Sequence, residues 1–318
     1  MQSLYMALSV SVPLLIYMGV GVLMRSRGIF SREQFLSLNG LSFRTFLPMI
    51  LFTNVYNADL KSMSDPPLFL FVLCGTVCCC LLFYSLSAHF STDKRDRATI
   101  AQGCYRSNYL LFGTIMAQAL SNAEGLALMA ALSAMTVPLF NVVAVILFES
   151  VRGGKIKPGH TLLSVIKNPI IIAGICGMFF AVTGLRLPSM VFSPLNGMSS
   201  AATPVALISL GGVLSFDSIK DHARILTFVA LMRLVAIPLV ALTVAVTVFH
   251  MHGNQVVMLL AVFASPTAVA SAPTAQSMGG NAILASEIVA VTSALCIVTI
   301  FLFVFTLSSL GVLTPVAG

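Results

Sequence analysis

The chain has 318 residues, of which 58% are hydrophobic and only 8% are charged, and its mean hydropathy is +1.00. A soluble domain carries about 25% charged residues, so this composition excludes a soluble globular protein and indicates a membrane protein. The net charge of +7 does not indicate nucleic-acid binding, because the cations stand in short loops between apolar runs, where membrane proteins carry them.

Apolar runs long enough to cross a bilayer follow one another along the whole chain. A spanning helix needs about 20 mostly apolar residues, and the sequence predicts about ten such helices. The first is expected to be a span rather than a signal peptide, because it lacks a basic start and a cleavage site. In chain order the predicted spans cover residues 4–24, 35–56, 67–88, 98–120, 125–148, 163–183, 190–215, 224–249, 255–277 and 282–311.

Positive charge is distributed unevenly over the loops. One set of alternate loops carries most of it, while the opposite set holds only Lys61 and Arg186. The positive-inside rule places the first set in the cytoplasm, so we expect both termini outside a bacterial inner membrane. The residues of the first set are Arg25, Arg27, Arg32, Lys94, Arg95, Arg97, Arg152, Lys155, Lys157, Lys220 and Arg224.

Short matches at an offset of about 156–158 residues predict an internal repeat. An odd number of spans separates the copies, so the second copy enters the membrane upside down. We therefore predict two inverted five-helix repeats, residues 1–150 and 160–318, an organisation typical of secondary transporters. The matching segments are 39–42 with 196–199, Pro13 with Pro169, Gly21 with Gly177, Gly28 with Gly184, and 117–120 with 275–278.

The spans at 98–120 and 255–277 contain helix-breaking and polar residues at mid-depth. Freed backbone groups are tolerated in a bilayer only where protein or a water-filled cavity satisfies them. We therefore predict that both helices break and cross, with their half-helix N-termini facing one anion site. A proline kink without any site, and Arg106 as the partner of an acid, are the plainer alternatives. The predicted substrate-binding residues are Arg106, Ser107, Asn108, Gly113, Ser265, Pro266, Thr267 and Pro273.

Other polar residues inside spans have two interpretations each. Asn141 is a candidate ion ligand or an interhelical hydrogen-bonding residue. Glu287 is either the partner of an arginine or a protonatable coupling group. Arg44 and Arg233 are expected to extend to the membrane interface or to bind lipid.

No sequence motif indicates an enzyme, a metal site or a cofactor. Metalloprotease, Walker A, nucleophile-elbow and dinucleotide-binding patterns are all missing from the sequence, so no catalytic residue is predicted. The seven cysteines lie inside apolar runs, where they serve as small packing residues. Coupling to Na⁺ or H⁺ is left open.

The order and spacing of several passages resemble the auxin efflux carrier family of membrane transporters, which includes bacterial malonate and malate carriers. The likeness covers most of the chain. The passages are 46–52, 106–113, 124–127, 137–141, 167–169, 184–188 and 203–212.

The resemblance implies a fold related to sodium/proton antiporters and bile-acid symporters. Spans 1, 2, 6 and 7 would form a dimerising scaffold, and spans 3–5 and 8–10 a mobile transport domain that moves like an elevator. Many members have a proline in span 4 where this chain has Gly113-Thr114-Ile115, so the break point of that span is left open.

These observations predict a lipid-embedded carrier of small organic anions, either mono- or dicarboxylates, and the resemblance implies that it is a homodimer. Asn108, Ser265 and Thr267 would hold polar substrate atoms, and Arg106 would neutralise the carboxylate. A sodium- or proton-coupled bile-acid-like symporter is the second interpretation. A non-transporting membrane sensor is the alternative from another class.

Overall fold

The computed structural model describes residues 2–57, 65–151, 167, 169–214 and 220–313. Regular structure in these residues is helical, apart from one isolated backbone bridge. The elements, which include π-helical turns (η1, η4) and a 3-10 turn (η3), are α1 (Gln2–Ser26), α2 (Arg32–Leu41), η1 (Ser42–Phe46), α3 (Leu47–Tyr56), α4 (Pro66–Leu86), η3 (Ser87–His89), α5 (Lys94–Tyr105), α6 (Tyr109–Leu120), α7 (Ala123–Val151), α9 (Pro169–Thr183), α10 (Ser189–Val213), α12 (Ala223–Leu231), η4 (Met232–Ala236), α13 (Ile237–Thr247), α14 (Asn254–Ala264), α15 (Ser271–Ser277) and α16 (Ala282–Ser309).

The predicted spans agree with these helices to within a few residues. The two spans predicted to break are each two helices, α5 with α6 and α14 with α15. The start of the span predicted at 163–183 lies outside the described residues, as do the end of the span predicted at 190–215, the repeat boundary at residue 160, and loop residues Lys61, Arg152, Lys155 and Lys157.

Several described helical stretches are long and apolar enough to cross a membrane. Four qualify alone, and α16 is a fifth if its two parts, which meet at a 43° bend, count as one span. Shorter apolar helices accompany them, so the number ten stays a prediction. The four stretches are Arg32–Tyr56, Pro66–His89, Ala123–Val151 and Ala223–Thr247.

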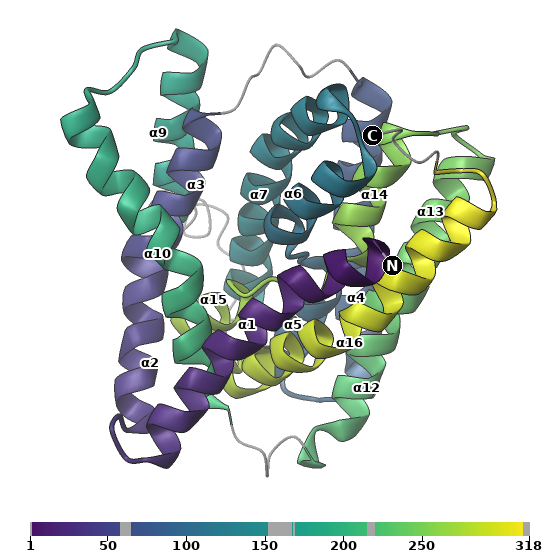
Figure 1. The fold of residues 1–318 in the computed structure, drawn as a ribbon. Coiled ribbons are helices and arrows are strands. Elements are labelled where there is room, and N and C mark those ends of the chain that lie inside the picture. The colour runs from purple at the N-terminus through teal and green to yellow at the C-terminus, as the bar shows by residue number, and fades with distance from the viewer. Residues whose placement is uncertain (1, 58–64, 152–166, 168, 215–219, 314–318) are drawn as a thin grey trace.

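The helices gather into two groups (Figure 1). Helices α2, α3, α9 and α10 stand together on one side of the molecule, where α3 packs on α9 and α10 packs on α2 and α3. Helices α4, α5, α6, α7, α12, α13, α14 and α16 stand on the other side, and the short helix α15 lies between the two groups, against α16 and α2. Helix α1 runs obliquely between them and packs against both α10 and α16. A functional division into scaffold and transport domain stays a prediction.

Glycines set the close approach of α1 to α10. A Cβ atom on Gly21 would collide with the Ile208 carbonyl oxygen, and one on Gly211 would collide with the carbonyl oxygen of Met18. Small residues at helix interfaces let backbones come this close in membranes. The α1–α10 contact therefore depends on the missing side chains.

A proline follows each of the two π-turns, with one residue between the turn and the proline. The amides of Leu47 and Ile237 bond to carbonyls five residues earlier, and Pro48 and Pro238 follow. A proline has no amide hydrogen to continue the α-helical pattern, which favours an irregular turn at this place. The second π-turn, η4, carries Arg233.

Candidate functional site

Two broken helices cross through short extended segments. Residues 106–108 separate α5 from α6, and residues 265–270 separate α14 from α15. The Asn108 amide donates to the Pro266 carbonyl at 2.8 Å, and the Ala268 amide donates to the Arg106 carbonyl at 3.0 Å. The predicted crossing is confirmed, and the break that the sequence left open lies at residues 106–108, well before Gly113.

The C-terminal carbonyls of α5 receive hydrogen bonds from outside their own helix. The Thr267 hydroxyl donates to the Gly103 carbonyl at 2.7 Å. Arg233 Nη1 donates to the carbonyls of Cys104 and Tyr105 at 3.1 and 3.4 Å. Because a helix end in a membrane has no bulk water to satisfy it, these two side chains stabilise the break.

Arg233 is fully buried, with only 1% of its surface exposed. Its Nε donates to the Ser265 carbonyl at 2.8 Å, and its Nη2 donates to the Val262 carbonyl at 2.7 Å. The expectation that Arg233 extends to the interface or binds lipid is therefore wrong. Its charge lies at the C-terminal ends of both α5 and α14, where helix dipoles favour a cation.

A cavity of about 360 Å³ adjoins the crossing. Its walls come from the crossing segments, from α7, and from α3 and α10 of the other helix group. Apart from Tyr109, apolar side chains make up the rest of the lining. The polar residues in its walls are Asn54, Arg106, Ser107, Asn108, Asn141, Ser199, Ser200 and Thr203.

Arg106 brings a buried positive charge to this cavity. Only 3% of its surface is exposed, and its Nη1 and Nη2 donate to Thr274 Oγ1 at 2.9 Å and to Asn141 Oδ1 at 2.6 Å. Both partners are neutral, and within the described residues no carboxylate lies within salt-bridge distance of Arg106. An uncompensated buried charge is strongly unfavourable, so the cavity is suited to receive an anion.

Three side-chain polar atoms of the cavity residues have no hydrogen-bond partner among the described residues. They are Ser107 Oγ, Asn108 Nδ2 and Asn54 Nδ2. Buried polar groups are nearly always hydrogen-bonded, so such atoms in a cavity wall indicate a ligand. Sequence reasoning missed Asn54, although an amide near the end of the predicted span 35–56 was an available signal.

Among the other predicted site residues, some line the cavity and others lie outside its lining. Asn141 lines the cavity as the partner of Arg106, and its Nδ2 donates to a carbonyl of its own helix. The hydroxyls of Ser265 and Thr267 bond to backbone carbonyls. The predicted residues that are not part of the cavity lining are Gly113, Ser265, Pro266, Thr267 and Pro273.

Glu287 is buried near the start of α16, away from the cavity lining. Its Oε2 lies 2.7 Å from Nδ1 of His222, which is 27% exposed. The sequence had not indicated this pair, because His222 stands at a span end 65 residues away. A histidine is thus one partner of Glu287, and the role of Glu287 as a protonatable coupling group stays a prediction.

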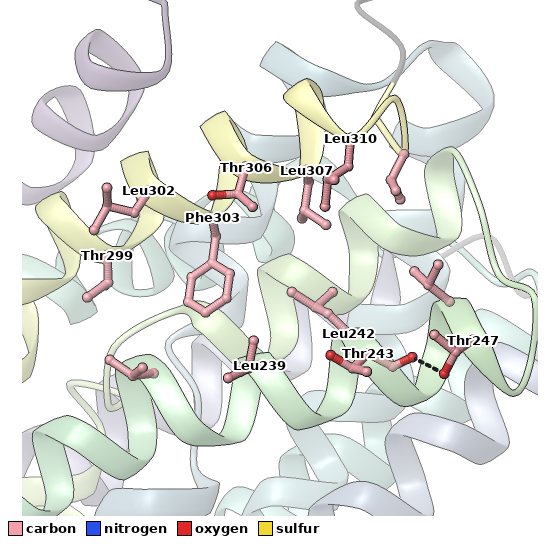
Figure 2. A pocket seen from close by; sticks show the side chains of 13 residues that line it. Leu239, Leu242, Thr243, Thr247, Thr299, Leu302, Phe303, Thr306, Leu307 and Leu310 are labelled. Carbon is pink, nitrogen blue, oxygen red and sulfur yellow. Dashed lines mark hydrogen bonds between the residues drawn. The ribbon is translucent and has the colours of Figure 1, made fainter.

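A second pocket, of about 400 Å³, lies between α13 and α16 (Figure 2). Leu239, Leu242, Phe303 and Leu307 point into it, and no charged residue lines it. The hydroxyl of Thr247 in its wall donates to a carbonyl of its own helix. Threonine hydroxyls are the polar groups of this pocket, whereas the cavity at the crossing has a buried guanidinium and three amides in its walls. The cavity at the crossing is therefore the candidate site for an anion.

Known proteins of similar sequence are membrane transporters. A family model described as membrane transport protein matches residues 6–304. An uncharacterized transporter of Methanothermobacter thermautotrophicus is 25% identical over 70% of this chain and 72% of its own length. The uncharacterized transporter YfdV of Escherichia coli K12 is 23% identical over 80% of this chain and 83% of its own length.

A solved structure has a similar fold. The sodium proton antiporter MjNhaP1 of Methanocaldococcus jannaschii, at pH 8, superposes with a TM-score of 0.59 over 95% of this chain and 96% of its own, at 9% identity. The expected antiporter-like, all-helical membrane fold is thereby confirmed. The chain belongs to the membrane transport protein family, the auxin efflux carrier family that its sequence resembles.

Proposed function

We propose that this integral membrane protein is a secondary active carrier of small organic anions, and that the cavity at the crossing holds the substrate. The observation that carries the proposal is Arg106, a buried guanidinium in the cavity wall whose hydrogen-bond partners are neutral. A bound carboxylate would supply the missing negative charge with charge-assisted hydrogen bonds.

The size and chemistry of the cavity support a short carboxylate as substrate. Its volume of about 360 Å³ lies at the lower end of the range of ligand pockets, which is about 300–1,000 Å³. Arg106 is the charged group among its lining residues, and Asn54, Ser107 and Asn108 offer neutral partners. The carboxylate would face Arg106, and a hydroxyl, keto or second carboxyl group would face the amides.

The walls of the cavity also support an elevator movement. Asn54 and Thr203 belong to α3 and α10, whereas Arg106 and Asn108 belong to the crossing. If the crossing shifts relative to α3 and α10, the anion moves with Arg106 and the cavity opens to the opposite side. Loop charges support an orientation in the inner membrane with both termini outside.

Uptake into proteoliposomes tests the proposed function. Labelled three- to five-carbon mono- and dicarboxylates, offered with their neutral amide analogues as controls, should enter only as acids. Uptake should saturate and should require the protein. Equal entry of acids and amides would contradict the proposed anion site, and binding without flux would favour the non-transporting sensor.

Removing either of the cavity amides that lack a hydrogen-bond partner, Asn108 or Asn54, should weaken substrate binding. We expect Asn108→Leu and Asn54→Leu each to raise the KM for transport by about 10-fold, because an unmade hydrogen bond to a bound anion corresponds to about 1–2 kcal/mol. Asn196→Leu, on the exposed part of α10, is the matched control and should keep the KM of the parent. An unchanged KM in both cavity variants would place the substrate elsewhere.

A further inference from the structure

Two helix ends of the same polarity meet at Arg233. Helices α5 and α14 both end at the crossing, and the carbonyl end of a helix carries partial negative charge. All three guanidinium nitrogens of Arg233 donate to main-chain carbonyls, at 2.7 to 3.4 Å, and these carbonyls belong to both helix ends. The side chain therefore closes a cage of backbone oxygens.

Backbone oxygens in this arrangement are ligands for a small cation. In carriers with discontinuous helices, unwound carbonyls and half-helix C-terminal ends coordinate the Na⁺ or H⁺ that is coupled to transport. Hard metal cations take oxygen ligands in general. At the crossing of this chain, the carbonyls of Val262, Cys104 and Ser265 already bond to a covalently attached cation.

Arg233 and Arg106 have separate places. Arg106 lines the cavity, whereas Arg233 is absent from the lining and lies behind the crossing, where its charge faces the two helix ends. A metal ion at the same carbonyls would lie within a few ångströms of the guanidinium. Two like charges about 4 Å apart repel each other by about 4 kcal/mol at an effective dielectric constant of about 20.

We infer that the guanidinium of Arg233 is a covalently attached substitute for a metal cation. It occupies, at the crossing, the position that a coupling metal ion occupies in related architectures. Consequently the carrier binds and moves its anion without Na⁺. Arg233 is a positioning residue: it keeps the two extended segments together and so keeps Arg106 and Asn108 in the cavity wall. The statement about transport rests on the proposed function, whereas the statement about the cage does not.

Thermal unfolding of purified protein tests the cage without any substrate. The chain has no tryptophan but has seven cysteines, of which Cys80, Cys104 and Cys296 are buried, so a fluorogenic thiol dye reports unfolding. Na⁺ is exchanged for choline at constant ionic strength, and the variants Arg233→Gln and Arg233→Lys are compared with the parent. Arg44→Gln, which removes an exposed arginine from a π-turn, is the matched control.

The parent, Arg233→Lys and Arg44→Gln should have melting temperatures that do not depend on Na⁺. Arg233→Gln should melt at a lower temperature and should gain a saturable stabilisation by Na⁺ or by low concentrations of guanidinium ion, because a ligand of the folded state raises its stability. A purely structural role for Arg233 would lower the melting temperature without producing this rescue.

Saturable stabilisation of the parent by Na⁺ over choline would overturn the inference, as would a folded Arg233→Gln protein that neither ion stabilises. If Arg233→Gln does not fold, the Na⁺ titration of the parent tests the inference: saturable stabilisation of the parent by Na⁺ overturns it, and a melting temperature that does not change with Na⁺ supports it. Carboxylate flux by the parent that stops without Na⁺ would overturn the inference but leave the proposed function intact. If no carboxylate is transported in any buffer and the melting temperature of the parent does not depend on Na⁺, the proposed function fails and the assignment of Arg233 to the cage stands.

Discussion

Arg106→Gln should reduce carboxylate transport, measured as kcat/KM in proteoliposomes, by about 100-fold or more. The substitution keeps a polar side chain of moderate length beside Asn141 and Thr274, but it removes the positive charge from the cavity wall. Losing one partner of a buried, hydrogen-bonded charge pair corresponds to about 2–5 kcal/mol, and about 3 kcal/mol is a factor of about 100.

Two further variants separate charge from position. Arg106→Lys keeps the charge but cannot reach both neutral partners at once, so it should retain more transport than Arg106→Gln. Arg44→Gln removes an exposed arginine and should transport like the parent at matched expression. Full activity of Arg106→Gln would show that the anion does not bind at this guanidinium.

Gly21→Ala and Gly211→Ala should each destabilise the protein strongly. Each added methyl group would collide with a carbonyl oxygen of the facing helix, and this backbone atom cannot move aside without separating α1 from α10. Overpacking of a tight contact corresponds to about 1–3 kcal/mol. The thiol-dye assay should record a melting temperature several degrees lower, about 2–4 °C per kcal/mol.

The same helices provide matched controls. Gly19 in α1 and Gly197 in α10 have nothing within 4 Å of an added Cβ atom. Alanine is a better helix former than glycine, so Gly19→Ala and Gly197→Ala should leave the melting temperature unchanged or raise it. Equal effects at all four positions would mean that α1 and α10 do not pack closely in the membrane.

Hydropathy and the positions of prolines were enough to predict most of the fold. Apolar runs mark the helices because lipid imposes a minimum length, and the Ser265-Pro266-Thr267 segment marked the break in the second crossing helix. The break in the first crossing helix has no proline. It lies at residues 106–108 because the backbone of residues 266–268 pairs with this segment and fixes the break there. The local sequence does not indicate that pairing.

The candidate site was only partly predictable for a similar reason. Arg106 and Asn108 stand out as polar residues inside a span, and both line the cavity. The hydroxyl of Thr267 was predicted to hold substrate but bonds to a backbone carbonyl. Arg233 contacts carbonyls 29 to 129 residues away in the chain. Its role depends on long-range packing, which the positions of charged residues in the sequence do not predict.

Counterflow of a labelled carboxylate tests the central claim most directly. Proteoliposomes are loaded with unlabelled substrate and diluted into buffer with a trace of labelled substrate, for the parent and for Arg106→Gln. A carrier with an alternating binding site should accumulate label transiently above its equilibrium level, and Arg106→Gln should not. If correctly folded parent protein accumulates no carboxylate above equilibrium, or if Arg106→Gln accumulates as much as the parent, the account of an anion carrier with its site at the crossing is contradicted.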